Sequence, residues 1–258
     1  MRARLLLFIS CVSLSLSASA QNTQNNPGSN HGNKFEQHEI INQDPNTYRS
    51  ASGTPGPQYW QQRADYNIDV ELDDAKQRIT GSETVTYYNN SPDPLTYIWL
   101  QLDENQYDPK SELQKINASS IKEKMTALEL QKIVGTEEDL GVKILKVTDG
   151  GNNALKYTIN QTMMRIELPK TLKHGEKFVF KVNWYYNISN RMTAGGRGGY
   201  EYFPEDQNYL YTITQWFPRL AVYSDFQGWQ NKQFFGSGEF ALAFGNFKVN
   251  ITAPADHI

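Results

Sequence analysis

The sequence predicts an all-β fold, an antiparallel β-sandwich with a short helical insertion. From Tyr59 onward, apolar and polar residues alternate with a period of two in short runs, as they do in half-buried strands. Clusters of Pro, Gly, Asn and Asp separate these runs, and such clusters form turns. Several short strands at regular spacing, joined by turns of this kind, are typical of an antiparallel sandwich or a curved sheet.

Each expected strand rests on this alternation. In the first one, Ile68, Val70 and Leu72 face one side while the polar residues between them face the other. The expected strands are 66–74, 78–90, 96–102, the two arms of a hairpin over 141–160 that turns at "DGGNN", 163–169, 177–188, 211–217, 239–244 and 246–254. A charged, helix-like insertion of one or two surface helices is expected at about 103–140, and "AGGRGG" at 194–199 is expected to be a loop.

The N-terminus predicts a signal peptide over residues 1–20. Arg2 and Arg4 precede a short apolar stretch, and "ASA" stands just before Gln21, which fits cleavage near Ala20 and a secreted or periplasmic protein. A lipoprotein anchor at Cys11 is the alternative. Residues 21–57 are rich in Asn, Gln, Ser, Gly and Pro, so we expect a flexible polar leader, followed by one domain over 58–258.

Charge and cysteine content exclude several functions. Removal of the two arginines of the signal leaves 23 basic against 28 acidic residues, which disfavours nucleic acid or an anionic membrane surface as the partner. The chain contains 1 cysteine, and it lies inside the signal, so the mature protein can form no disulfide within its own chain.

The sequence offers no catalytic or metal site of its own. The 4 histidines lack the H-x-x-x-H spacing that places two ligands on one turn of a helix, and no G-x-S-x-G is present. The adjacent carboxylates Asp73–Asp74 and Glu137–Glu138 fall in turn-like or helical surface segments, where solvated charges are the expected interpretation.

An aromatic-rich segment, residues 209–240, is the best candidate for a functional role. Most of its aromatic residues are expected to pack a long loop onto the sheet. Gln215 does not fit that interpretation, because it stands between Thr214 and Trp216 at the end of an alternating run. A buried amide must be hydrogen-bonded or face a wet cleft.

The segment "LYTITQWFPRLAVYSDFQGWQNKQFFGSGEFALAFGNFKVNITAPADHI" resembles the end of the N-terminal β-domain of aminopeptidase-N-like zinc metallopeptidases (gluzincins). It is most similar to the secreted bacterial branch, which has "QWFPR…YSD…GW" in place of T-Q-x-E. The resemblance extends through residues 64–102 and 172–186, and so covers about 59–258 apart from the 103–140 region.

This resemblance implies a saddle-shaped β-domain that packs against a thermolysin-like catalytic domain. In the family, that second domain holds zinc with H-E-x-x-H and a distant Glu, and it binds the substrate N-terminus with G-x-M-E-N. None of these motifs occurs in this chain, so the resemblance implies a partial chain that is inactive alone, with zinc, the catalytic domain and the peptide substrate belonging to the parent enzyme.

The resemblance carries over one site position, Gln215, which matches a polar cleft-lining residue of the T-Q-x-E segment. Phe217 stands where that motif has Glu, so a carboxylate that pairs with an α-amine is absent and strict aminopeptidase specificity is not implied. The residues that match the bacterial branch are expected to hold the loop rather than to contact substrate; they are Arg219, Tyr223, Asp225 and Trp229.

Two other hypotheses remain open from the sequence. One is a free-standing β-sandwich that binds glycan or peptide on a stacking platform of Trp184, Trp216 and Trp229. The other is a scaffold paralogue without activity. If the domain normally covers a catalytic half, we expect it to expose an apolar patch on its own.

Overall fold

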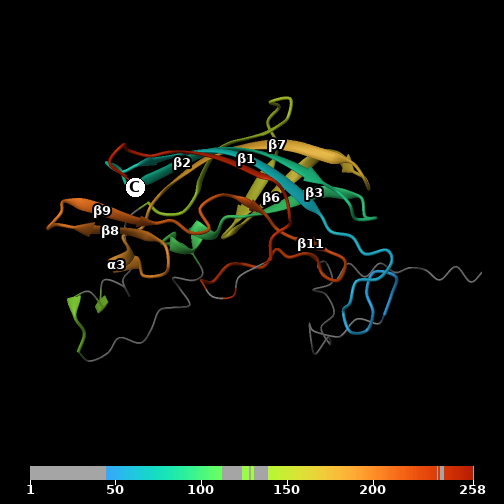
Figure 1. The fold of residues 1–258 in the computed structure, drawn as a ribbon, viewed down its shortest axis with the longest axis horizontal. Coiled ribbons are helices and arrows are strands. Elements are labelled where there is room, and N and C mark those ends of the chain that lie inside the picture. The colour runs from blue at the N-terminus through green and yellow to red at the C-terminus, as the bar shows by residue number, and fades with distance from the viewer. Residues whose placement is uncertain are drawn as a thin grey trace, which may run out of the picture.

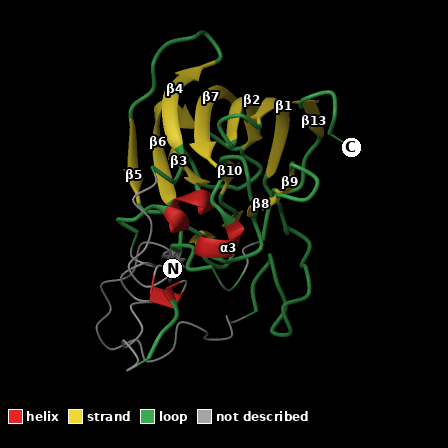
Figure 2. Ribbon diagram, turned by 90° about the vertical axis from the view of Figure 1, so that its left-hand side faces the viewer, coloured by secondary structure: helices red, strands yellow, loops and turns green. Residues whose placement is uncertain are grey.

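The computed structural model of the chain describes residues 45–111, 124–127, 129–130, 139–236, 238 and 241–257. Two sheets form its body, as Figure 1 and Figure 2 show. The larger sheet contains, in spatial order, β13 (Phe247–Thr252), β1 (Arg63–Asp73), β2 (Arg78–Tyr88), β7 (Lys177–Asn187) and β4 (Lys143–Asp149). The smaller sheet contains β10 (Arg219–Leu220), β3 (Leu95–Gln101), β6 (Met163–Leu172) and β5 (Tyr157–Asn160).

The predicted all-β sandwich is confirmed. Among the named strands of the described residues, every pairing is antiparallel except that of β13 with β1, which is parallel. One buried cluster takes side chains from both sheets, for example Ile68 and Phe180 from the larger sheet and Ile98 and Ile166 from the smaller. Each such side chain contributes about 1.5–3 kcal/mol when it leaves water.

The strand β2 lies at the centre of the larger sheet and buries one of its faces. Ile79, Val85 and Tyr87 lie on this buried face, and the residues of the opposite face are more exposed. Gly81 lies on the same buried face, opposite Trp184 of β7. A Cβ atom at this glycine would overlap the Trp184 ring, so the absence of a side chain lets the indole lie against β2.

Two smaller sheets lie at opposite ends of the sandwich in Figure 1. One is the hairpin of β8 (Gly199–Phe203) and β9 (Asn208–Thr212), and the other pairs β11 (Tyr223–Ser224) with β12 (Gly228–Trp229). The 3₁₀ helix η1 (Asp103–Tyr107) follows β3, and the single turn α3 (Arg191–Ala194) precedes β8. None of the helices in the described part of the chain has the length and apolar character that a membrane crossing requires.

The predicted hairpin over 141–160 forms only around its turn. Asp149 N donates to Asn153 O at 2.9 Å and Leu155 N to Val147 O at 3.0 Å. The chain then crosses to the smaller sheet, where β5 pairs with β6 rather than with β4. The turn at Asp149–Asn153 was therefore predicted correctly. The pairing of the second arm was predicted wrongly, because this arm pairs with β6 of the smaller sheet.

The predicted strand 239–244 is also wrong in its described part. Residues 241–243 form no strand, and Phe244 makes a single parallel bridge to Arg63. Gly245 follows, and a Cβ atom there would overlap the carbonyl of Ala64. The segment thus only approaches the start of β1, and regular pairing begins at β13. Most of the predicted helical insertion at 103–140 lies outside the described residues, as do the predicted signal peptide and residues 21–44.

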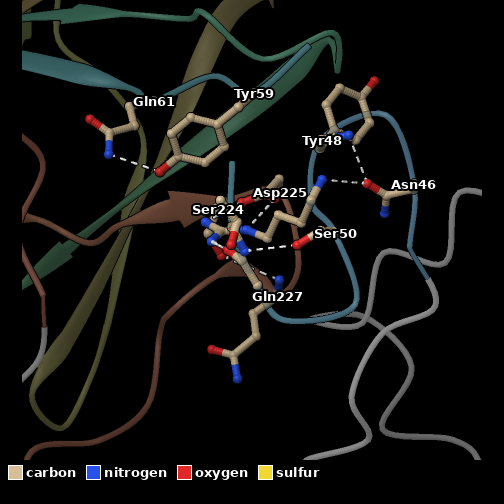
Figure 3. Close-up of polar contacts among 11 residues, drawn as sticks. Asn46, Tyr48, Ser50, Tyr59, Gln61, Ser224, Asp225 and Gln227 are labelled. Carbon is tan, nitrogen blue, oxygen red and sulfur yellow. Dashed lines mark hydrogen bonds and ion pairs between the residues drawn. The ribbon is translucent and has the colours of Figure 1, made fainter. Parts of the chain in front are cut away.

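Residues 45–57, expected as part of a flexible leader, instead form turns that dock on the β11–β12 end of the domain. Arg49 Nε donates to Asp225 Oδ2 at 2.6 Å and its Nη2 donates to Oδ1 at 3.0 Å. The guanidinium also lies 4.9 Å from the ring centroid of Tyr59. Figure 3 shows the surrounding turn, in which Asn46 accepts from the backbone N of Tyr48 and of Arg49. A bidentate ion pair to a carboxylate that is 3% exposed explains why this segment is held in place.

Candidate functional site

Gln215 lies in the irregular segment 213–218, which connects β9 to β10. The expected strand over 211–217 is shorter than predicted, since β9 ends at Thr212, three residues before Gln215. Gln215 has a left-handed backbone with φ of 52°, which is uncommon for a residue other than glycine. Its Nε2 atom is inaccessible to solvent and has no hydrogen-bond partner among the described residues.

The two residues after Gln215 are anchored in the core. The Trp216 ring lies 6.1 Å from the ring of Trp184, centroid to centroid, and the Phe217 ring lies 5.5 Å from that of Tyr66 in an edge-to-face arrangement. Such aromatic pairs stabilise by about 0.5–1.5 kcal/mol beyond the area they bury. The position that holds Glu in the T-Q-x-E pattern is therefore a packing position in this chain.

Arg219 ends the segment and forms a buried ion pair. Its guanidinium donates from Nη2 to Asp103 Oδ2, and the two side chains are 10% and 1% exposed. The next residue, Leu220, donates its backbone N–H to Tyr66 Oη at 2.9 Å. Burial raises the pKa of the Tyr66 phenol well above its ordinary value, so this hydroxyl stays neutral and accepts the bond. Both contacts fix the path of the chain after Gln215.

A second carboxyl group lies beside this ion pair, in η1. Burial, and then the negative charge of Asp103, raises the pKa of the Glu104 carboxyl to about 8. Burial also raises the pKa of Tyr107 to about 12, with a further contribution from Glu104. A Cβ atom at Gly196 would overlap the Tyr107 hydroxyl, which places the predicted loop 194–199 directly on η1.

The same loop contacts the segment that carries Gln215. A Cβ atom at Gly198 would lie 3.1 Å from Thr214 Oγ1. The candidate site therefore comprises three neighbouring pieces of chain: η1, the loop 194–199 and the segment 213–218. These three pieces and the adjoining Arg219 contain one amide nitrogen without a partner, a buried ion pair and a carboxyl group with a raised pKa, and perturbed groups of this kind gather at functional sites.

The residues expected to hold the loop do so. Tyr223 donates from its hydroxyl to Asp93 Oδ2 at 2.7 Å, and its ring packs edge-to-face on Trp229 at 5.1 Å. Asp225 binds Arg49, and Arg219 binds Asp103 as described above. Arg219, Tyr223 and Trp229 are engaged within residues 58–258, in agreement with the sequence interpretation, whereas Asp225 holds the preceding segment 45–57.

The tryptophan platform of the binding-module hypothesis is not formed. Trp184 is 0% exposed and Trp229 is 6% exposed, and both belong to the central cluster. Trp216 is partly buried and packs on the same cluster. The rings of Trp184 and Trp229 lie inside the sandwich, so the three tryptophans do not share one exposed face.

No group of three or more His, Cys, Asp and Glu residues that could hold a metal ion occurs in the described part of the chain. His174 Nδ1 lies 2.9 Å from the backbone O of Ser91, in a turn. His257 lies beside Asp256 and against Tyr211. His31, His38 and Cys11 lie outside the described residues.

Sequence reasoning missed the charged groups in the interior. Glu83, on β2, is 2% exposed, and neither carboxyl oxygen has a hydrogen-bond partner among the described residues. Burial raises the pKa of this carboxyl well above its ordinary value. The alternation of β2 could have revealed it, because Glu83 shares its face with Ile79 and Val85. The Asp103–Arg219 pair joins residues 116 positions apart, and no local pattern reports such a contact.

No protein-family model matches this sequence, and no curated protein matches it. Similar solved structures include a mutant two-domain M1 zinc metallopeptidase bound to L-tryptophan, with 12% identity and a TM-score of 0.37 over 78% of this chain and 35% of the other. The complex of such a mutant with L-arginine is 13% identical in sequence and has a TM-score of 0.36, over 76% of this chain and 32% of the other. The M1 zinc metallopeptidase from Deinococcus radiodurans is 12% identical in sequence and has a TM-score of 0.37, over 78% of this chain and 34% of the other. The chain spans about a third of the length of these structures, and the likenesses are too weak to assign a function.

Proposed function

We propose that residues 58–258 form the non-catalytic N-terminal domain of a secreted, aminopeptidase-N-like zinc metallopeptidase, and that Gln215 lines its substrate cleft. One observation carries the proposal. Gln215, which the sequence resemblance singles out, combines a left-handed backbone with an amide nitrogen that has no partner. Strained backbone and unsatisfied polar groups persist where a site uses them, since elsewhere they only destabilise.

The chemistry of an amide suits peptide binding. Nε2 is inaccessible to solvent in this structure, so we assign the substrate contact to Oε1, which can accept from a peptide N–H or an amine. Phe217 offers no carboxylate at the neighbouring motif position and packs against Tyr66 instead. We therefore assign Gln215 the role of orienting a peptide backbone and do not restrict the proposed substrates to peptides with a free N-terminus.

The zinc ion of this proposal does not belong to the described residues, which contain no fitting group of ligands. In the proposed parent enzyme, a catalytic domain outside residues 58–258 supplies the metal and the general base. In this proposal, the role of residues 58–258 is limited to positioning the substrate. We accordingly propose no catalytic step for its own side chains.

An apolar edge supports a partner domain. Phe247, Val249 and Ile251 of β13 are 51%, 38% and 73% exposed. They pair with Tyr66, Ile68 and Val70, so they continue the buried face of β1 beyond the cover of the smaller sheet. Exposed apolar patches of this kind mark interaction surfaces. The proposed occupant is the catalytic domain, and a protein that stays monomeric and soluble on concentration without it would count against this assignment.

The proposal is tested first on the gene and then on the enzyme. A coding sequence that continues beyond codon 258 into H-E-x-x-H with a downstream Glu supports it, whereas a stop codon at that point in intact genomic DNA rejects it. In the longer protein, Gln215→Ala should lower kcat/KM for peptide hydrolysis about tenfold, the loss expected for one hydrogen bond to substrate.

Gln207→Ala is the matched control. Gln207 has a similar left-handed backbone, with φ of 53°, but it is exposed in the turn between β8 and β9. Both substitutions change backbone strain alike, so only the loss of a substrate contact separates them. Equal kcat/KM values for the two variants would reject the cleft role of Gln215. If Gln215→Ala has no effect and the longer protein lacks activity, the scaffold hypothesis takes its place.

A further inference from the structure

The β8–β9 hairpin carries four tyrosine side chains on one face. Tyr200 pairs with Tyr211 and Tyr202 with Tyr209, and residues that face each other across an antiparallel pair share a face, as do residues two apart. The rings contact one another: their centroids are 4.9 Å apart for Tyr202–Tyr209 and 6.0 Å apart for Tyr209–Tyr211. We call these four residues the tyrosine face.

One end of the tyrosine face is covered and the other is open. Tyr211 stacks on His257 at 5.8 Å, and its hydroxyl lies 3.4 Å from the backbone O of Asp74. Tyr202 and Tyr209, toward the tip of the hairpin, are 49% and 38% exposed. Figure 1 shows the hairpin extending from one end of the sandwich. An isolated two-stranded sheet is only marginally stable in water. A ligand on the open aromatic face would supply the contacts that this hairpin lacks, and exposed patches of this kind mark interaction sites.

The charge around the open end is negative. Residues 199–212 contain three acidic and no basic residues. Glu201 is paired with Arg191 at 2.7 Å, on the other face of the hairpin. Glu205 and Asp206 lie exposed in the turn next to the Tyr202–Tyr209 pair, and neither is joined to a cation among the described residues. Tyrosine rings attract cations through their faces, and carboxylates at the same end strengthen that attraction.

We propose that the tyrosine face, with Glu205 and Asp206, binds an extended peptide segment that carries Lys or Arg side chains. The open rings are those of Tyr202 and Tyr209, whose centroids lie 4.9 Å apart. One cationic side chain of the peptide can lie over this pair, while a second, about 6.6 Å further along the extended chain, reaches the carboxylates at the tip. This binding surface is independent of the proposed peptidase, because it lies on β8 and β9 and needs neither zinc nor a catalytic domain.

A fluorescein-labelled octapeptide of alternating Arg and Ser is the probe, with fluorescence anisotropy of the purified protein as the readout. Binding should weaken about twofold to fivefold in Tyr209→Ser, the loss expected for one exposed cation–π contact. It should also weaken in the double variant Glu205→Gln, Asp206→Asn, and with rising salt. Tyr157→Ser is the matched control, because Tyr157 is 39% exposed on β5, away from the hairpin, and its loss should leave binding unchanged.

The carboxylate variant keeps every ring in place, so the proposal stays testable even if Tyr209→Ser loosens the hairpin. Equal binding of a peptide with citrulline in place of Arg would overturn the proposal, since citrulline keeps the shape and removes the charge. Unchanged binding in both hairpin variants would also overturn it. So would binding of a neutral oligosaccharide in place of the peptide, or a concentration-dependent dimer that Tyr209→Ser abolishes, since these would assign the face to a glycan or to a second copy of the chain.

Discussion

Glu83 gives the sharpest prediction, because its carboxyl group is buried at the centre of the larger sheet without a partner. It lies between Ile68 of β1 and Val182 of β7, and both of its oxygens lack a hydrogen bond among the described residues. The pKa of the Tyr66 phenol responds to the charge of Glu83. Burial without a hydrogen-bond partner favours the protonated form of this carboxyl in the folded protein.

The sign of the pH dependence follows from proton binding. Burial raises the pKa of Glu83 in the folded state well above the ordinary value of 4.5. Above that value the unfolded chain releases the proton while the folded chain retains it, so the unfolded state binds fewer protons and the free energy of unfolding falls as the pH rises. The loss is about 1.4 kcal/mol for each pH unit between the ordinary value and the folded pKa.

Urea unfolding at several pH values measures this loss. Glu83→Leu removes both the titration and the buried polar group, so its stability relative to the wild type should rise by about 1.4 kcal/mol for each pH unit over the same range. Glu83→Gln should show the same trend with a smaller advantage, because a buried amide still lacks partners. Glu71→Gln, at an exposed position of β1, is the control and should show no trend. Parallel pH profiles for the wild type and Glu83→Leu would refute the assignment of a buried, protonated carboxyl.

Two further substitutions test the packing around the candidate site. Arg219→Met should destabilise by about 3–5 kcal/mol in chemical denaturation, because it leaves the buried carboxylate of Asp103 without the guanidinium, and a change below 1 kcal/mol would contradict the burial of the pair. Gly81→Ala should destabilise by about 1–3 kcal/mol and alter the near-ultraviolet circular dichroism, because the new methyl group displaces the Trp184 ring. The adjacent Ser82→Ala, which points to the other face of β2, should do neither.

The fold was largely predictable because alternation reports burial directly. The strands β1, β2 and β7 each carry the two-residue period, and their buried residues all lie on one face. The hairpin of β8 and β9 was overlooked, although Tyr200 and Tyr202 alternate before the turn-forming Pro-Glu-Asp. Its tyrosines are exposed on an isolated pair of strands, so the usual contrast between a polar and an apolar face is missing.

Pairing between distant segments could not be read from the sequence. The parallel union of β13 with β1 joins residues about 181 positions apart, through contacts such as Asn250 Nδ2 to Asp69 Oδ1 at 2.7 Å. The second arm of the predicted hairpin at Asp149 instead pairs with the strand that follows it, since Asn160 and Met163 face each other across the turn at Gln161–Thr162. Local patterns indicate which residues are buried, and the complete fold decides what they are buried against.

The candidate site combines both kinds of information. The alternating apolar residues of 211–217 predicted a strand. In the structure, two of these residues are instead anchors on two different strands, with Trp216 on Trp184 of β7 and Phe217 near Tyr66 of β1. These anchors hold the preceding backbone in the left-handed conformation of Gln215. An amide fixed by packed neighbours loses little freedom when it binds a ligand, and such rigid support is what a binding group needs. The aromatic residues are thus explained by packing, and Gln215 is the residue of this segment whose placement packing alone does not explain.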